Sequence, residues 1–315
     1  MRSIGMAYRE KVLYRYYMID SSQTLLIGVD GGGTGCRVAI GTLADGILTR
    51  ADGGRANVAS DPDLAIKNVV AAVAAAAAMC GIPSERLKSA TAHLGLAGIM
   101  TQQDAQKVAA ALPYNKVTVT DDRPTALNGA LGGQDGFLLS VGTGTIAATC
   151  TSGIFRSVGG WGFHLSDQAS GSWMGQECLR HVLLCHDGLA EHTELTRTLL
   201  AKFENDPNKI VVFSMTAKPG DYGIFAPDIV QAAGAKDPIG LTIMRAGSDH
   251  LKRCLDVLGF KVGDALCLTG GVGPFYADYL PADVTSGLLA RKGNALDGAF
   301  DFARINATKN TEAIV

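Results

Sequence analysis

Two glycine turns and a pair of aspartates are the residues best suited to chemistry in this sequence. Asp30 ends an apolar run and is followed by Gly31-Gly32-Gly33-Thr34. Such a turn exposes backbone N–H groups in a concave surface that suits a phosphate group. Glycine leaves room for the phosphate and admits the positive φ values expected in a turn of this kind. Asp30 would supply a carboxylate to Mg²⁺, which usually keeps several waters beside phosphate oxygens.

The second turn is Gly142-Thr143-Gly144-Thr145, which offers further N–H groups and two hydroxyls. It is suited to hold the other side of a polyphosphate. Each glycine turn leads into a strand, and the sequence contains no GxxxxGK[ST] motif, so neither turn is a P-loop or a Rossmann fingerprint. The alternative interpretation of each glycine turn is an ordinary hairpin turn that binds no phosphate.

Asp121 and Asp122 directly follow the apolar alternation Lys116–Thr120. Open α/β folds bind their ligands at the carboxyl ends of strands, so a carboxylate is expected there. Transfer of a phosphoryl group to an alcohol needs a carboxylate that accepts the hydroxyl proton. The alternative is that these aspartates cap a helix beginning near Pro124, because Asp favours the N-cap and Pro the first helical position. One aspartate can cap while the other acts as a base.

The elements around the two turns repeat. Aligning Gly33-Thr34-Gly35 with Gly142-Thr143-Gly144 places LLIGVD over the region of FLLSV and the strand CRVAIGT over IAATC. In each copy an apolar strand, a glycine turn, a second strand, another turn and a third strand follow one another. The repeat predicts two similar lobes that face each other across a cleft, with chance similarity of two hairpins as the alternative.

The remaining elements alternate between helix and strand, which is typical of a layered α/β domain with a largely parallel sheet. A Gly/Trp/Ser-rich loop spans 159–171. The expected elements are helices at 63–80, 103–111, 173–201, 227–258 and 295–305, and strands at 89–96, 116–120 and 265–269.

Composition indicates a globular protein that binds small molecules. The chain has 315 residues, 47% of them hydrophobic and 18% charged, and a net charge of −2. Extended disorder is excluded, and no basic field attracts nucleic acid or an anionic membrane. The seven cysteines include no CxxC pair, which favours reduced thiols in the cytoplasm. The apolar run Val69–Cys80 is shorter than the roughly 20 residues of a membrane-spanning helix.

From Leu25 to about Arg304 the chain resembles the BadF/BadG/BcrA/BcrD branch of the actin-like, hexokinase-type ATPases. Within that branch it is similar to N-acetylglucosamine kinases and glucosamine kinases. The motifs that carry the resemblance are GVDGGGTGCR at Gly28–Arg37, GTGT at Gly142–Thr145, GGWGF at Gly159–Phe163 and GGVG at Gly270–Gly273. The resemblance implies a two-lobe α/β protein of the actin-like ATPase (ribonuclease H-like) fold, with duplicated hairpin-plus-sheet domains.

The resemblance also implies roles for individual residues. ATP and Mg²⁺ would be the cofactors, with the metal at Asp30 through water and adenosine against the last glycine motif. The residues expected at ATP are Asp30, Gly31, Gly32, Gly33, Thr34, Arg37, Gly142, Thr143, Gly144, Thr145, Gly270, Gly271 and Gly273. The residues expected at the sugar are Asn57, Asp122, Thr145, Gly160, Trp161 and Asp167, with Asp122 as the base. Closure of the lobes on the sugar would exclude water.

One segment departs from the family pattern. Most relatives read GDEGSG where this chain has Ser166-Asp167-Gln168-Ala169-Ser170-Gly171. Gln168 replaces a charged acceptor for a sugar hydroxyl or an amine. The departure leaves the choice between glucosamine, its N-acetyl form and a muramic-acid derivative open.

The expected activity is transfer of the γ-phosphoryl group of ATP to the 6-hydroxyl of N-acetylglucosamine or glucosamine. A sugar-sensing ATP-binding protein without efficient transfer is the first alternative. An ATP-driven activator of a 2-hydroxyacyl-CoA dehydratase is the second, prompted by Gly132-Gly133-Gln134-Asp135, although no cysteine pair is placed for an iron–sulfur cluster. Cys178, His181 and Cys185 share a helix face, which favours a buried stripe over a metal site.

The expected domains are an extension of no assigned role at 1–24, an N-terminal lobe at 25–121, a C-terminal lobe at 122–294, and a helix and tail at 295–315 that return to the first lobe. Met18 is an alternative start of the chain. Similar kinases often form dimers, so a homodimer is compatible with the resemblance.

Overall fold

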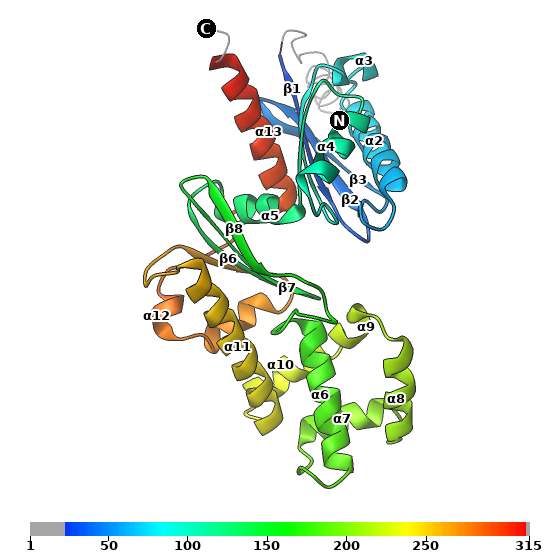
Figure 1. Cartoon of the computed structure of the whole chain (residues 1–315), viewed down its shortest axis with the longest axis vertical. Coiled ribbons are helices and arrows are strands. Elements are labelled where there is room, and N and C mark those ends of the chain that lie inside the picture. The colour runs from blue at the N-terminus through cyan, green and yellow to red at the C-terminus, as the bar shows by residue number, and fades with distance from the viewer. Residues whose placement is uncertain (1–22, 313–315) are drawn as a thin grey trace, which may run out of the picture. The chain divides into compact units, whose positions relative to one another are not determined.

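A computed structural model describes residues 23–312 of the chain, which form two compact units. The first unit contains the described residues up to Gly133 and those from Lys292 onward, and the second runs from Gln134 to Arg291. Most of the expected extension, including Met18, lies outside the described residues. In Figure 1 the chain is coloured along its length, so the return of the last helix to the first unit is easy to follow.

The first unit is built on a five-stranded sheet of order β3-β2-β1-β4-β5, in which β1, β2 and β3 are antiparallel and β4 and β5 run parallel to β1. Its strands are β1 (Leu25–Gly31), β2 (Cys36–Thr42), β3 (Gly46–Gly53), β4 (Thr91–Leu96) and β5 (Lys116–Thr120). Its helices are α2 (Pro62–Met79), α3 (Ser84–Leu87), α4 (Gln102–Ala111), α5 (Asp122–Leu131) and α13 (Ala295–Glu312).

Strand β1 is apolar on both faces because helices cover both faces of the sheet. Ile27 and Val29 belong to the core shared with α2, whereas Leu26 packs with α13. Gly28 allows the close approach of α13, since a Cβ there would lie 2.5 Å from the Phe300 backbone nitrogen.

Helix α2 is long and apolar enough to cross a membrane by length and composition alone. Its environment in the first unit explains that composition. Its buried side chains pack in the core beside the sheet, and they are Ala65, Val69, Ala72, Val73, Ala76 and Ala77. The apolar composition of α2 is therefore explained by its packing in the core of the first unit.

The second unit repeats the arrangement of the first. Its five-stranded sheet has the order β10-β9-β6-β7-β8, with the first three strands in sequence antiparallel and the last two parallel to β6. Read from the other edge, this is the strand order of the first sheet, so the predicted duplication is present in the fold. The strands are β6 (Gly136–Val141), β7 (Thr145–Thr151), β8 (Ile154–Gly159), β9 (Leu266–Thr269) and β10 (Leu288–Leu289).

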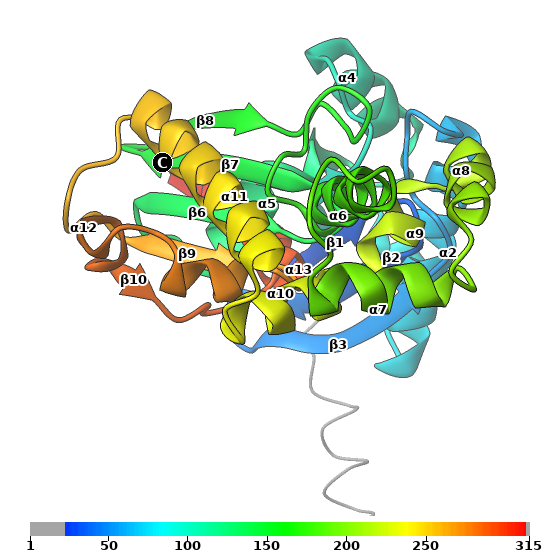
Figure 2. The same cartoon turned by 90° about the horizontal axis from the view of Figure 1, so that it is seen from below.

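The second unit differs from the first by a group of helices between β8 and β9, of which α11 contacts β7 and β8 (Figure 2). These helices enclose the larger core cluster. They are α6 (Gly171–His186), α7 (Glu194–Lys202), α8 (Pro207–Thr216), α9 (Pro219–Gly223), α10 (Ala226–Gly234) and α11 (Pro238–Leu258), followed after β9 by a 3-10 helix (Gly273–Asp278) and α12 (Ala282–Thr285).

The boundary between the units differs from the expected one. We expected the second lobe to begin at residue 122, whereas α5 stays in the first unit because it packs against α13. The packing is close, since a Cβ on Gly298 would overlap the Thr125 carbonyl. Asp122 is therefore a residue of the first unit.

Candidate active site

The first half of the candidate site lies at the carboxyl ends of β1, β4 and β5. The strands are parallel there, and Asp30 is level with Gly95, which is level with Thr120. Asp30 and Asp122 therefore share one edge of the sheet. Gly95 makes room for α5, because a Cβ at that position would overlap Thr125.

The first glycine turn is closed by its own backbone. Gly32 N donates to Gly35 O at 2.9 Å, and Gly32 O accepts from Ala56 N at 2.9 Å. None of the glycines from Gly31 to Gly35 has a positive φ, so the expectation of positive φ in this turn was wrong. A Cβ on Gly33 would meet no atom within 4 Å. The turn itself does not require glycine at position 33, and the open space there is what a phosphate group would need.

Asp30 is paired with Arg37 on the neighbouring strand β2. Both Arg37 Nε, at 3.0 Å, and Nη2 donate to Asp30 Oδ2. The side chain of Asp30 is 14% exposed, whereas that of Arg37 is 51% exposed. Arg37 was expected at the phosphates of ATP, and in this structure it orients Asp30 and leaves part of its guanidinium open to solvent.

The two aspartates after β5 have different roles. Asp121 is the N-cap of α5, where its Oδ1 accepts from Arg123 N at 3.0 Å and pairs with the Arg123 side chain. Asp122 is the first helical residue and is half-buried. Burial raises the pKa of the Asp122 carboxyl above its usual range, and the negative charges of Asp121 and Asp30 raise it further. A carboxylate with a raised pKa is a stronger base than an ordinary aspartate.

Asn57 lies close to Gly98, a residue of the connection between β4 and α4. A Cβ on Gly98 would lie 2.6 Å from Asn57 Oδ1. That oxygen accepts from Ser60 N at 3.1 Å and Ser60 Oγ at 3.3 Å, so the amide Nδ2 group is the part that can donate to a ligand. Ala97 N donates a hydrogen bond to Gly31 O, and Ala97 O accepts one from Val58 N. These bonds connect this region to the first turn.

The second half of the candidate site is the turn from Gly142 to Thr145. Gly142 N donates to Gly144 O at 2.9 Å, and Gly142 O accepts from Gly171 N at 2.8 Å. A Cβ on Gly142 would meet nothing within 4 Å, as at Gly33. The Thr145 hydroxyl is buried and finds no hydrogen-bond partner among residues 23–312. A buried orphan hydroxyl beside an open turn fits a polar ligand.

Asp167 holds this second turn from the side. Its carboxylate packs against Gly144, where a Cβ would lie 2.9 Å from Asp167 Oδ2, and the nearby backbone N–H groups of Thr145 and Gly162 favour its charged form. Asp167 is 8% exposed, and burial raises the pKa of its carboxyl. The unpartnered hydroxyl of Thr145 is therefore the group of this turn that a polar ligand could satisfy.

The segment that carries Asp167 is strained. Asp167 has φ +68° and Ala169 has φ +72°, a region that side-chain-bearing residues rarely adopt. The buried Tyr276 hydroxyl donates to Ala169 O at 2.8 Å and holds the segment in place. Sequence reasoning did not identify Tyr276, because this contact joins residues 107 positions apart and no local pattern marks it.

The loop at 159–171 places Trp161 between two glycines with positive φ, Gly160 at +73° and Gly162 at +90°. Trp161 is 77% exposed, which is unusual for an indole and suits stacking on a ligand. Trp173, the other tryptophan, packs against the core of the second unit. Trp161 is therefore the tryptophan whose ring is exposed enough to stack on a ligand.

The last glycine motif adjoins the second turn. Gly270 has φ +84°, and a Cβ there would overlap the Val141 carbonyl, so the fold itself requires glycine. Val272 N donates to Val141 O at 3.0 Å. A Cβ on Gly271 would meet nothing within 4 Å, which leaves the open surface expected beside adenosine.

A magnesium ion fits the donors of the first half-site. Among residues 23–312 no group of three His, Cys, Asp or Glu side chains is placed to enclose a metal. Mg²⁺ beside nucleotides commonly uses one or two carboxylates together with phosphate oxygens and water. Asp30 provides such a carboxylate, and a cation beside it would offset the negative charge that helps to raise the pKa of Asp122.

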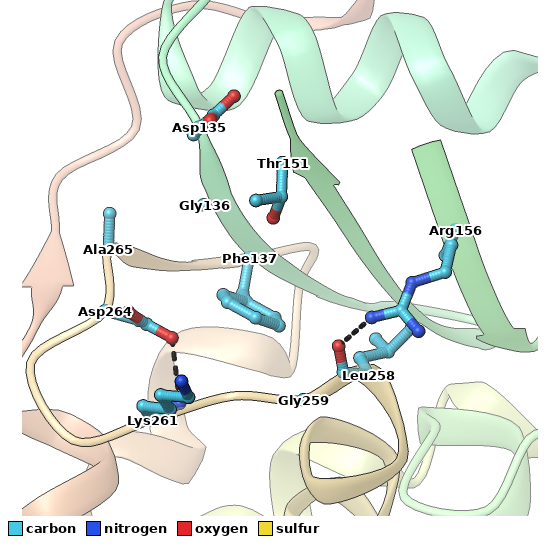
Figure 3. Close-up of a pocket in the computed structure, with 10 residues that line it drawn as sticks. All are labelled: Asp135, Gly136, Phe137, Thr151, Arg156, Leu258, Gly259, Lys261, Asp264 and Ala265. Carbon is cyan, nitrogen blue, oxygen red and sulfur yellow. Dashed lines mark hydrogen bonds between the residues drawn. The ribbon is translucent and has the colours of Figure 1, made fainter. Parts of the chain in front are cut away.

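A cavity of about 370 Å³ lies at the opposite end of the second sheet (Figure 3). It is lined at the start of β6 by Asp135 and Phe137, and Arg156 donates to the Leu258 carbonyl across it. The turn from Gly142 to Thr145 follows the other end of β6, so this cavity is separate from the second half of the candidate site.

Comparison with known proteins matches this architecture. The model of the BadF/BadG/BcrA/BcrD ATPase family matches residues 27–277. A glucosamine kinase of Vibrio cholerae is 32% identical over 279 residues, which cover 88% of this chain and 95% of the relative.

Solved structures show the same fold. A provisionally assigned N-acetylglucosamine kinase from Chromobacterium violaceum superimposes with a TM-score of 0.79 at 29% identity, covering 90% of this chain and 99% of that one. A ROK family glucokinase from Streptomyces griseus, in complex with glucose and AMPPNP, has a TM-score of 0.53 at 18% identity, covering 89% and 99%. The expected α/β fold of actin-like, hexokinase-type ATPases is confirmed.

Proposed function

Because the chain belongs to the BadF/BadG/BcrA/BcrD ATPase family, we propose that it is an amino-sugar kinase. The reaction transfers the γ-phosphoryl group of ATP to the 6-hydroxyl of glucosamine or N-acetylglucosamine. Support comes from relatives named for these two activities, one of which covers nearly the whole chain. We place the reaction in the cytoplasm, where ATP is available.

The observation that carries the proposal is the pairing of a base with phosphate-sized openings. Asp122 has a raised pKa at the strand edge that also holds Asp30. Gly33 and Gly142 both stand at turns where a Cβ would meet only open space. Open space beside backbone N–H groups at both turns is what binding of an anion requires.

In the proposed mechanism Asp122 accepts the proton of the 6-hydroxyl as its oxygen attacks phosphorus. The bond from the γ-phosphorus to the bridging oxygen breaks, and ADP leaves with that electron pair. The glycine turns donate backbone N–H groups to the phosphates. Mg²⁺, held by Asp30 through water, would offset phosphate charge. Asn57, Asp167 and Trp161 bind and orient the sugar.

The test is ADP release with Mg-ATP over glucosamine, N-acetylglucosamine, N-acetylmuramic acid and glucose, with Asp122→Asn as the paired variant. We expect turnover with one amino sugar and its loss in Asp122→Asn. If no sugar stimulates ADP release, the kinase proposal fails and a sugar-sensing ATP-binding protein takes its place. If Asp122→Asn turns over at the normal rate, the kinase stands and its base lies elsewhere.

A further inference from the structure

His93 is a buried titratable residue that the proposed mechanism does not use. It lies in β4 and is 4% exposed. Its ring packs against Phe302 of α13, with ring centroids 4.8 Å apart. Burial lowers the pKa of His93 to about 4, so the imidazole is neutral near pH 7.

Both imidazole nitrogens of His93 contact hydroxyls of the neighbouring strand. Nδ1 lies 2.8 Å from Thr118 Oγ1, and Nε2 lies 3.3 Å from Thr120 Oγ1. The two threonines are alternate residues of β5 and so share one face of the sheet. His93 and Thr118 are directly paired in the parallel register.

The direction of each hydrogen bond can be assigned from the donors available. Thr120 Oγ1 donates its hydrogen to Asp121 O at 2.8 Å, so its oxygen must accept the Nε2–H of His93. His93 Nδ1 is then an acceptor, and the nearer partner of the Thr118 hydroxyl is that nitrogen at 2.8 Å rather than Ala92 O at 3.3 Å. Asn306 of α13 donates to Thr118 at 2.9 Å.

The chain of bonds ends on the peptide unit that carries the base. The Asp121 carbonyl and the Asp122 nitrogen belong to one planar peptide group. A bond that fixes the Asp121 oxygen therefore also fixes the direction in which the backbone of Asp122 leaves β5. On the far side of this residue, the Asp122 carbonyl accepts from Thr125 Oγ1 at 2.9 Å.

We propose that His93, acting through Thr120, is a positioning residue for Asp122 in phosphoryl transfer. The proposal rests on the proposed function, because it assumes that Asp122 is the base. His93 touches neither substrate. It holds the peptide of Asp122 at the angle from which the carboxylate reaches the acceptor hydroxyl, and its loss lowers kcat while the KM values for sugar and ATP stay unchanged.

Two isosteric substitutions on β5 test the proposal. Thr120→Val and Thr118→Val each remove one hydroxyl bonded to the same imidazole, but only Thr120 connects to Asp121. We expect Thr120→Val to lower kcat by about 10- to 100-fold, since small misplacements of a catalytic group cost this much. Thr118→Val should lower the melting temperature about as much as Thr120→Val does, but it should change kcat by less than about twofold.

Substitutions of His93 separate positioning from packing. His93→Phe keeps an aromatic ring beside Phe302 and loses both hydrogen bonds, so kcat should fall as in Thr120→Val. His93→Gln retains one donor and one acceptor and should restore most of kcat. Equal kcat losses in Thr120→Val and Thr118→Val, or no loss in either, would overturn the proposal.

Asp122→Asn distinguishes failure of this inference from failure of the proposed function. If Asp122→Asn is inactive and the two threonine variants behave alike, Asp122 is the base and His93 does not position it. If Asp122→Asn is fully active, the assignment of the base has failed, and the inference fails with it.

Discussion

The two units have sheets of the same strand order, yet different groups stand at the carboxyl ends of their strands. The first unit presents Asp30 and Asp122, and burial together with the charges of Asp121 and Asp30 raises the pKa of Asp122. The second presents the turn from Gly142 and the unpartnered hydroxyl of Thr145, while its acid, Asp167, packs against Gly144 of that turn. The two units therefore have similar turns with different side chains, and under the proposed function the first would supply the base and the metal-binding carboxylate while the second would supply neutral donors.

The units also differ in how their turns are held. All the non-glycine residues with positive φ in the described part of the chain belong to the second unit, and they are Ser152, Asp167, Ala169, Glu204, Asn205 and Lys236. Asp167 and Ala169 stand directly beside the second turn. Strain of this kind persists only where surrounding contacts hold it, and it gathers at functional sites. The first turn has no strained residue of this kind, because strand register, the Arg37 pair and backbone hydrogen bonds hold it with ordinary backbone angles.

The largest effect predicted from this contrast concerns Asp122 in the first unit and Asp167 in the second. Asp122→Asn removes a proton acceptor, so kcat should fall by about a thousandfold while the melting temperature holds or rises, because a repelled buried charge is gone. Asp167→Asn puts an NH₂ group in place of one carboxylate oxygen, in a buried position against Gly144 where the nearby backbone N–H groups favour an oxygen, so stability should fall by about 1–3 kcal/mol. Steady-state kinetics and thermal melting of both variants measure the two effects. A destabilised Asp122→Asn or an unaffected Asp167→Asn would contradict the division of roles.

The next effect concerns the glycines. Gly33→Ala and Gly142→Ala add a methyl group that meets no protein atom within 4 Å, so both variants should fold normally. Each methyl group would obstruct the phosphates, and loss of one bond to a charged group predicts a rise in KM for ATP of about 10- to 100-fold. Gly270→Ala is the contrasting variant, because its φ of +84° and the nearby Val141 carbonyl predict a loss of stability. Unchanged ATP kinetics in both turn variants would show that no phosphate lies there.

The sequence predicted the parts of the site that depend on local pattern. Alternation and turn residues identified the two hairpins, and the position of Asp121 and Asp122 after a strand identified a cap and a candidate base. The prediction of positive φ in the first turn was wrong because the turn closes through the bond from Gly32 N to Gly35 O with ordinary backbone angles. Glycine composition alone does not distinguish a need for unusual φ from a need for open space.

Contacts between distant residues could not be predicted from the sequence. The bond between Tyr276 and Ala169 spans 107 residues, and that between Asn306 and Thr118 spans 188. The assignment of α5 to the first unit likewise depends on α13, which is encoded after the whole second unit. Such contacts arise from the register and packing of complete sheets, which no window of residues contains.

A smaller effect is predicted for Ala169→Gly, which tests whether the second turn is held under strain. Glycine removes the cost of φ +72° but loses a buried methyl group and gains freedom in the unfolded chain. We expect a net stabilisation of up to about 1 kcal/mol. Chemical denaturation measures it, with Ala39→Gly in β2 as a control that should only destabilise. A loss of stability as large as in the control would mean that Ala169 is not strained.

The smallest effect concerns the charge beside the base in the first unit. Asp122 accepts a proton only when ionised, so kcat should fall as the pH drops through its raised pKa. Asp121→Asn keeps a good N-cap residue and removes a negative charge that raises this pKa, so the acidic limb of the kcat profile should move to lower pH. Asp104→Asn, in the capping box of α4, is the control that should leave the limb in place. A limb that stays unmoved in Asp121→Asn would mean that the group titrating in kcat is not Asp122, and the contrast between the two units would then need a different base.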